Sequence, residues 1–249
     1  MPLENQFGIR VFKTLGTLLK TNIYAKIIEI LLVFLVALLF IQWLISDEAS
    51  DLIYNQFVVW LANIIMLFMV YMGLRLRGEP LTHFGFSFKK FNLKFALRTL
   101  LQSMLVFVIA LLGFVLGAIV MANIVGIPES PDMGGYDYLK NNVWMLFVSL
   151  AGIYVASSFG EEVIYRAFLI NRISELGLNS RSGKITAVII SALIFGLVHY
   201  SWGIVGIVQT AFMGLALGFS YLFLKKKIWV LILAHVYMDT ILILQLYFS

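Results

Sequence analysis

The sequence predicts an all-α protein, a polytopic bundle of about seven transmembrane helices preceded by an N-terminal interfacial helix. Of its 249 residues, 61% are hydrophobic and only 12% are charged, and the mean hydropathy is +0.97. Soluble domains carry roughly twice that charged fraction. Long windows without charge also recur along the chain, each of about the length that crosses the hydrocarbon core of a bilayer. Together these observations predict a multi-pass protein of the cell membrane.

The spans are placed where about 20 mostly apolar residues can cross roughly 30 Å of hydrocarbon. The window from Ile185 to Leu224 is too long for one crossing, and we divide it at Tyr200 to Gly203, where aromatic, small and glycine residues suit an interfacial turn. The predicted spans are residues 30–46, 52–74, 99–128, 142–175, 185–199, 203–224 and 228–249.

Three segments follow from this map. Residues 1–26 mix basic and apolar side chains, a pattern typical of an amphipathic interfacial helix. Residues 27–128 hold the first three spans, and residues 141–249 hold a core of four spans, all within one membrane domain. The chain has no cysteine, which excludes a disulfide framework, a thiolate metal site and a cysteine nucleophile.

The loop charges predict the orientation. Basic residues that stay in the cytoplasm account for the net charge of +5, so we expect no nucleic-acid partner. The N-terminus and C-terminus are therefore expected in the cytoplasm and outside the cell, respectively. The expected cytoplasmic segments carry Arg10, Lys13, Lys20, Lys26, Arg75, Arg77, Lys89, Lys90, Lys94, Arg172, Arg181, Lys184 and Lys225 to Lys227, and the opposite loops carry Asp47, Glu48, Asp51, Glu129, Asp132, Asp137 and one lysine, Lys140.

A few ionisable residues lie within the predicted spans, where each costs a few kcal/mol and therefore suggests a functional site. His83, by contrast, falls in a basic cytoplasmic loop and is expected to be an ordinary interfacial residue. The intramembrane residues are Glu161, Glu162, Arg166, His199, His235 and Asp239.

Helix geometry predicts which of these side chains cooperate. Residues four apart share a face of a helix, so Glu162 is expected to pair with Arg166, and His235 with Asp239. Glu161 and Glu162 point about 100° apart. We therefore expect Glu161 to face the site and Glu162 to form a structural ion pair.

Depth is compatible with one shared site. At 1.5 Å per residue, Glu161 lies about 20 Å from the cytoplasmic end of its helix, and His199 about 22 Å beyond Lys184. His235 lies some 12 Å beyond Lys227, with Asp239 one turn deeper.

These residues fall in three motifs that resemble those of the CPBP family of intramembrane proteases, which includes the CAAX prenyl endopeptidases and bacteriocin-processing and immunity proteins. The resemblance covers about residues 141–245, and the first three spans carry no motif. The motifs are E-E-x-x-x-R at 161–166, F-x-x-x-H at 195–199 and H-x-x-x-[ND] at 235–239, so that Phe195 accompanies His199.

The resemblance implies peptide-bond hydrolysis inside the membrane, with Glu161 as the general base that activates water and His199 beside it. His235 and Asp239 would stabilise the developing oxyanion, and Glu162, Arg166 and Phe195 would support the site. Two histidines and carboxylates also suit zinc, so a zinc version with Glu161, His199, His235 and Asp239 as ligands stays open beside a metal-free one. Related prenyl proteases carry asparagine where this chain has Asp239, which puts a pure oxyanion role there in doubt.

Other classes fit less well. The chain lacks the H-E-x-x-H motif of helical zinc proteases. A non-catalytic immunity or regulatory protein of the same family is the main alternative, and a small transporter is disfavoured because the spans show no corresponding halves. The expected partners are the bilayer and a membrane-associated peptide or protein, with or without a lipid group.

Overall fold

The computed structural model describes residues 3–48, 51–87, 92–126 and 134–248, and these ranges contain helices and no strand. The prediction of an all-α polytopic bundle is confirmed. Four residues named above, Lys89, Lys90, Glu129 and Asp132, lie outside the described ranges, as do residues 127–128 of the third predicted span and Ser249.

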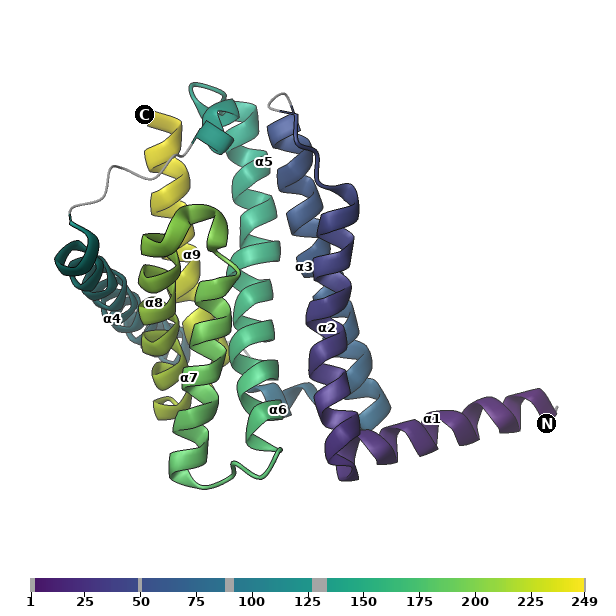
Figure 1. Ribbon diagram of the computed structural model, residues 1–249. Coiled ribbons are helices and arrows are strands. Elements are labelled where there is room, and N and C mark those ends of the chain that lie inside the picture. The colour runs from purple at the N-terminus through teal and green to yellow at the C-terminus, as the bar shows by residue number, and fades with distance from the viewer. Residues whose placement is uncertain (1–2, 49–50, 88–91, 127–133, 249) are drawn as a thin grey trace.

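Two long helices form one flank of the bundle. α2 (Ile23–Leu44) is capped by Asn22, whose side chain accepts a hydrogen bond from the Ala25 amide, and α3 (Leu52–Arg77) ends where Gly78 adopts a left-handed conformation at φ +61°. α1 (Leu3–Thr21) leaves this flank at a large angle to α2 (Figure 1). That course suits a helix at the membrane surface, although the three-segment division of the chain stays a prediction.

The fourth predicted span is the centre of the molecule. It is one helical rod made of α5 (Val143–Ile153), the π-helical segments η4 (Tyr154–Phe159) and η5 (Glu162–Ile170), and α6 (Asn171–Ser174). Every residue from Glu162 to Ile170 is buried. π-Helical turns are rare and occur often at functional sites, and here they flank Glu161, with Glu162 as the first residue of η5.

The last three helices surround this rod. α7 (Arg181–Leu197) and α8 (Gly203–Phe223) form an antiparallel pair joined by η6 (Tyr200–Trp202), as the predicted break requires, and α9 (Ile228–Phe248) packs on the rod. Gly214 and Gly218 lie directly against α7, where added Cβ atoms would come within 3.0 Å of Phe195 Cδ1 and 2.7 Å of Val188 Cγ1. The glycine pair thus brings the two helices close enough for Phe195 to reach the core.

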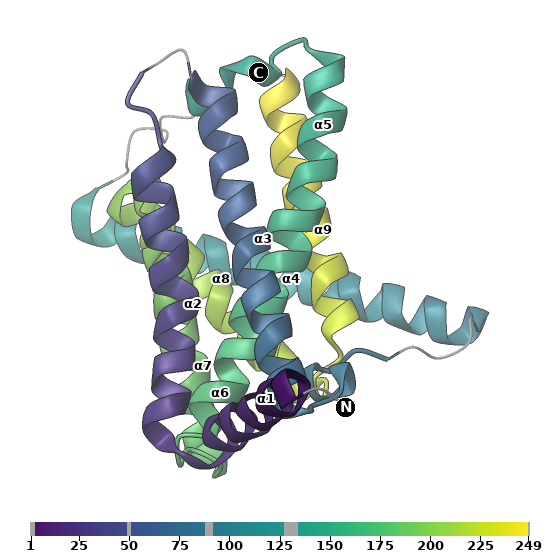
Figure 2. The same cartoon turned by 90° about the vertical axis from the view of Figure 1, so that its right-hand side faces the viewer.

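The third predicted span has an unusual course. α4 (Leu93–Val125) has 33 residues and lies across the bundle, inclined steeply to α2, α3 and α9 (Figure 2). It packs against α8, where a Cβ on Gly117 would come within 2.8 Å of Gln209 Cα. At about 1.5 Å per residue it is close to 50 Å long, more than the hydrocarbon thickness, so a strong tilt allows it to remain in the bilayer.

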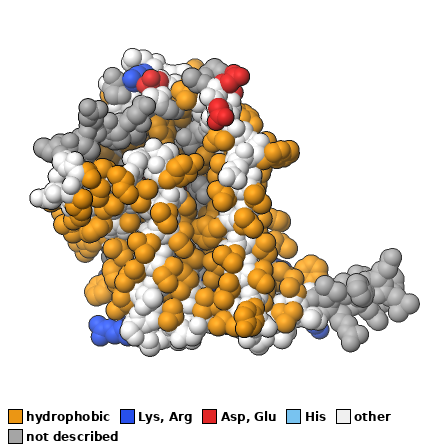
Figure 3. Space-filling model, viewed as in Figure 1, with side chains coloured by type: hydrophobic (Ala, Val, Ile, Leu, Met, Phe, Trp, Pro, Cys, Tyr) orange, Lys and Arg blue, Asp and Glu red, His pale blue; other side chains and the backbone are white. Residues whose placement is uncertain are grey.

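Within the described ranges, six helical segments are long and apolar enough to cross a membrane. The prediction of about seven spans counted α7 as one of them. With 17 residues, α7 is the shortest of the long bundle helices and is not among these six. Hydrophobic side chains cover the flank of the bundle in Figure 3, while charged side chains on that face gather at its two ends. The molecule is therefore a multi-pass membrane protein.

Two short 3-10 helices close the ends of the bundle. η2 (Leu81–Phe84) follows α3 at the end where α1 also lies, and η3 (Gly134–Leu139) packs against α9 at the opposite end, near the C-terminus (Figure 1). Leu139 of η3 is fully buried against Ile243 and Leu246.

Candidate active site

The predicted intramembrane residues of the central rod and α9 come together at one histidine. The Nδ1 atom of His235 lies 2.9 Å from Oε1 of Glu162, and its Nε2 atom lies 3.8 Å from Oε2 of Glu161. The same Nε2 atom is 3.7 Å from Oδ1 of Asp239, one turn further along α9. His235 is 97% buried, so three carboxylates surround an imidazole ring in the interior of the bundle.

Both glutamates therefore approach the side chain of His235, whereas we expected only Glu161 to face the site. The reason is that an imidazole offers two nitrogen atoms on opposite edges, and each glutamate approaches a different one. Exposure still distinguishes them, since the side chain of Glu161 is 14% exposed and that of Glu162 is fully buried. Glu161 is the carboxylate that a molecule entering the site could reach.

The expected pair of Glu162 and Arg166 is present, with Arg166 Nη1 3.1 Å from Glu162 Oε1 and both side chains buried. The guanidinium group of Arg166 also lies 4.2 Å from the ring centroid of Phe195, in a cation–π contact. Phe195 in turn packs edge-on against Tyr165 at a centroid separation of 5.0 Å. These contacts fix α7 to the central rod beside the cluster.

His199 reaches the cluster only through its neighbours. It follows the end of α7, where its Nδ1 atom lies 2.7 Å from the carbonyl oxygen of Phe195, and its ring contacts those of Phe195 and Trp202 at 4.9 and 5.1 Å. Among the described residues it makes no ion pair with a carboxylate. The structure thus brings together five of the predicted residues, with His199 beside them. The five are Glu161, Glu162, Arg166, His235 and Asp239.

The motifs did not include two further residues of this region. Ser158 on η4 is fully buried and donates a hydrogen bond of 2.6 Å to Oδ2 of Asp239. Tyr136 on η3 lies near the carboxylates at the end of the bundle that holds the C-terminus, and burial raises its pKa to about 12, reinforced by Tyr138, Asp239 and Glu161. Neither residue forms part of a spacing pattern with the motifs, so only the fold could reveal them.

The positions of the donor atoms decide whether the intramembrane cluster can hold a metal ion. The four proposed zinc ligands do not converge, because the described residues hold three such atoms within 4.8 Å of one another only at Glu79, His83 and Glu175. The intramembrane cluster as placed here therefore does not fit a zinc ion.

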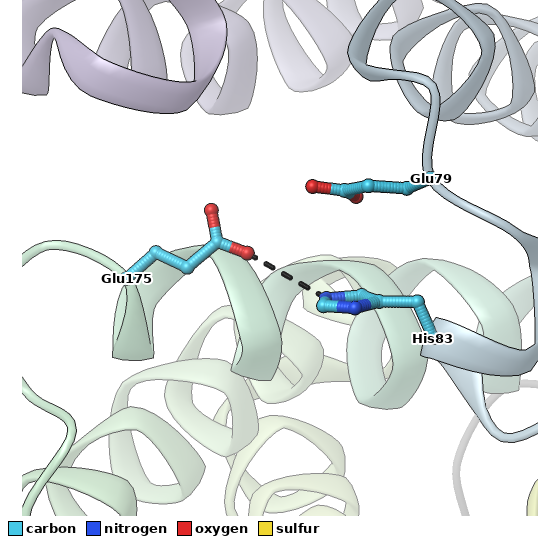
Figure 4. Close-up of side chains that lie close together, drawn as sticks. All are labelled: Glu79, His83 and Glu175. Atoms are coloured by element: carbon cyan, nitrogen blue, oxygen red, sulfur yellow. Dashed lines mark ion pairs between the residues drawn. The ribbon is translucent and has the colours of Figure 1, made fainter.

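The group that does converge lies at the cytoplasmic end predicted from the loop charges. Figure 4 shows Glu79 and Glu175 near His83, with an ion pair of 3.7 Å between His83 Nε2 and Glu175 Oε1. Its spacing could hold a metal ion. Arg172, however, lies 2.7 Å from one oxygen of each glutamate, and His83 is part of an ion-pair network rather than an ordinary interfacial residue.

The fold and the cluster define the general class: this is a multi-pass helical membrane protein with carboxylates, a histidine and an arginine gathered in its core. Residues 142–241 match the family described as Type II CAAX prenyl endopeptidase Rce1-like, which corresponds to the CPBP and CAAX protease family. The family is one of intramembrane peptidases, and all three motifs lie within the matched segment. No curated protein and no solved structure matches the chain.

Proposed function

We propose that this protein is an intramembrane endopeptidase in which Glu161 activates the attacking water molecule. The observation that supports this most directly is the difference between the two adjacent glutamates. Glu162 is fully buried and held by Arg166 and His235, whereas Glu161 is partly exposed and faces the same histidine. A reachable carboxylate in a site of low dielectric can act as a general base.

In the proposed reaction, the residues act one after another. Glu161 removes a proton from water, and the resulting hydroxide attacks the carbonyl carbon of the scissile peptide bond. The oxyanion that forms accepts hydrogen bonds from His235 Nε2–H and from His199. Glu161 then delivers its proton to the amide nitrogen as the C–N bond breaks, which yields a carboxylic acid and an amine.

We propose a membrane-anchored peptide of the prenylated CAAX type as the substrate, because the matched family is described as prenyl endopeptidases. The protein would lie in the cell membrane with its N-terminus in the cytoplasm and its C-terminus outside. A zinc-dependent version would require Glu161, His199, His235 and Asp239 to move together. Cleavage that withstands chelators, in protein without stoichiometric metal, would support the metal-free version.

The decisive experiment compares Glu161→Gln with wild type in lipid vesicles, using a fluorogenic peptide that carries a farnesylated cysteine three residues before its C-terminus. The change keeps the shape of the side chain and removes the base, so we expect at least a thousandfold loss of kcat, as for other essential groups. The same peptide without the farnesyl group tests the substrate class.

Asp137→Asn is the matched control, because it removes an acidic side chain that is 57% exposed and lies on η3, outside the cluster. It should retain wild-type cleavage. A fully active Glu161→Gln protein would contradict the proposal and would favour a non-catalytic immunity or regulatory protein of the same family.

A further inference from the structure

A groove of about 780 Å³ runs along the start of α4, outside the candidate active site. Figure 2 shows this part of α4 extending beyond α9, away from α2 and α3. The groove therefore lies on the outer surface of the bundle. The described residues that line it all belong to α4 and are Leu93, Lys94, Leu97, Arg98, Leu101, Gln102 and Leu105.

Helix geometry explains why one side of the groove is apolar and the other is basic. Side chains four residues apart form a ridge along a helix, and neighbouring ridges meet at a spacing of three residues. The apolar ridge, which we call the leucine ridge, consists of Leu93, Leu97, Leu101 and Leu105, each 50–66% exposed. The neighbouring ridge consists of Lys94, Arg98 and Gln102.

The basic ridge carries charges that the protein does not neutralise. Lys94 and Arg98 are both exposed, and neither forms an ion pair within the described ranges, whereas Arg77 at the end of α3 is held by two glutamates. Lys227, just before α9, donates a hydrogen bond of 3.2 Å to Oε1 of Gln102. A third cation thus adjoins the inner end of this ridge.

The dimensions of the groove suit one leaflet of a bilayer. From Leu93 to Leu105 the leucine ridge rises about 18 Å, close to the roughly 15 Å of half a hydrocarbon core. After Arg98, α4 contains no charged residue. An acyl chain can therefore lie along the leucines while a negative headgroup contacts the basic side chains. A zwitterionic headgroup would bring its own cation toward them, which makes it the weaker ligand.

We propose that the start of α4 is a binding site for one anionic phospholipid, with the phosphate group at Lys94 and Arg98 and an acyl chain along the leucine ridge. The opposite face of α4 is fixed to α9, where Ser103 and Tyr237 hydrogen-bond over 3.0 Å. The bound lipid would thus lie on the outer side of a helix that is held in place. This site is independent of the proposed peptidase function.

Fluorescence quenching tests the proposal with the full-length protein in vesicles of dioleoylphosphatidylcholine. Because the chain has no cysteine, Met104→Cys can carry a single bimane label beside the leucine ridge, at a position that is 53% exposed. A small fraction of the lipid is replaced by either phosphatidylglycerol or phosphatidylcholine with brominated, quenching acyl chains. Each basic residue favours an anionic lipid about fivefold, so we expect phosphatidylglycerol to be preferred roughly 20-fold at this site.

Matched variants assign the preference to the basic ridge. Lys94→Gln combined with Arg98→Gln should make the two brominated lipids quench the label almost equally. Lys94→Arg combined with Arg98→Lys keeps both charges and should keep the preference. Lys13→Gln combined with Lys20→Gln removes two exposed charges from α1 and should leave the preference unchanged. A label at Leu35→Cys, 47% exposed on α2, should be quenched equally by both lipids.

Equal quenching of the Met104→Cys label by both lipids in the otherwise unchanged protein would overturn the proposal. A preference that persists without the charges of Lys94 and Arg98 would overturn it as well. An equal loss in the α1 variant, or an equal preference at Leu35→Cys, would show that overall charge attracts the lipid instead of this groove. None of these outcomes depends on peptide cleavage.

Discussion

Arg166 shows at the scale of one residue how a charge can lie in the core of this bundle. Its guanidinium group is 99% buried between the carboxylate of Glu162 and the ring of Phe195. Glu162 Oε2 and both terminal nitrogens of Arg166 make no hydrogen bond to the described residues. The pair is therefore held by charge and by the aromatic contact, and removal of one partner leaves the other charge uncompensated.

We predict that Arg166→Met lowers the free energy of unfolding by about 3–5 kcal/mol, the usual loss when one partner of a buried pair is removed. Arg166→Met combined with Glu162→Gln should recover part of that loss, since no uncompensated charge remains. Denaturant unfolding in detergent measures both. Arg181→Met, at the exposed start of α7, is the control, and an Arg166→Met protein as stable as wild type would contradict the prediction.

Individual residues also show what the sequence could predict. The spacing of four residues placed Glu162 beside Arg166 and His235 beside Asp239, because side chains at that spacing share a helical face. It could not show that Glu161 and Glu162 reach opposite nitrogens of one histidine, which depends on how α9 packs against the rod. Ser158 was missed because a serine in an apolar helix has no signature of its own.

At the scale of elements, ion pairs at the end of the bundle where α1 lies connect four parts of the chain. Arg77 at the end of α3 contacts Glu29 of α2 and lies 2.8 Å from Oε2 of Glu175, which follows α6. His83 of η2 pairs with the other oxygen of Glu175. Burial alone would raise the pKa of Glu175, but a hydrogen bond from His83 and the charges of Arg172 and Arg77 lower it to about 2.

The lowered pKa predicts a pH-dependent contribution to stability. Because the folded value lies below the ordinary 4.5, ionised Glu175 stabilises the fold fully above about pH 4.5 and loses that effect as the pH falls toward 2. Glu175→Gln should therefore be less stable than wild type at pH 7, and this difference should shrink between pH 4.5 and 2. Thermal unfolding at a series of pH values measures it.

Glu48→Gln provides the comparison, since Glu48 is an exposed carboxylate at the opposite end of α2. Its stability should track wild type at every pH. A difference between Glu175→Gln and wild type that stays constant down to pH 2 would show that the network does not depend on the charge of Glu175.

The elements themselves were predictable to different degrees. The break at Tyr200 to Gly203 was indicated by residue types and is confirmed by η6, where Gly203 adopts φ +70°. The π-helical turns of the central rod were not indicated by the sequence, because an α-helix and a π-helix share the same apolar composition. The steep course of α4 was also beyond the sequence, since length alone limits tilt without fixing it.

At the scale of the whole molecule, the two termini lie at opposite ends of the bundle (Figure 1). The chain has no cysteine, so single cysteines can report orientation without background. We predict that Lys140→Cys is labelled by a membrane-impermeant maleimide in intact cells, and that Lys20→Cys is labelled only after permeabilisation. Both side chains are exposed.

The cysteine-free wild type is the control and should take up no label. Labelling of Lys20→Cys but not Lys140→Cys in intact cells would reverse the proposed orientation. Labelling of both sites would mean that the two ends do not lie on opposite sides of the membrane.

The short α7 has a consequence for the surrounding lipid. Seventeen residues rise about 25 Å, less than the roughly 30 Å of hydrocarbon in a typical bilayer. Lipids beside α7 must shorten or tilt to match it, and such mismatch thins the membrane locally. Since α7 ends just before His199, the thinned region would bring the headgroup layer and its water close to the buried carboxylates.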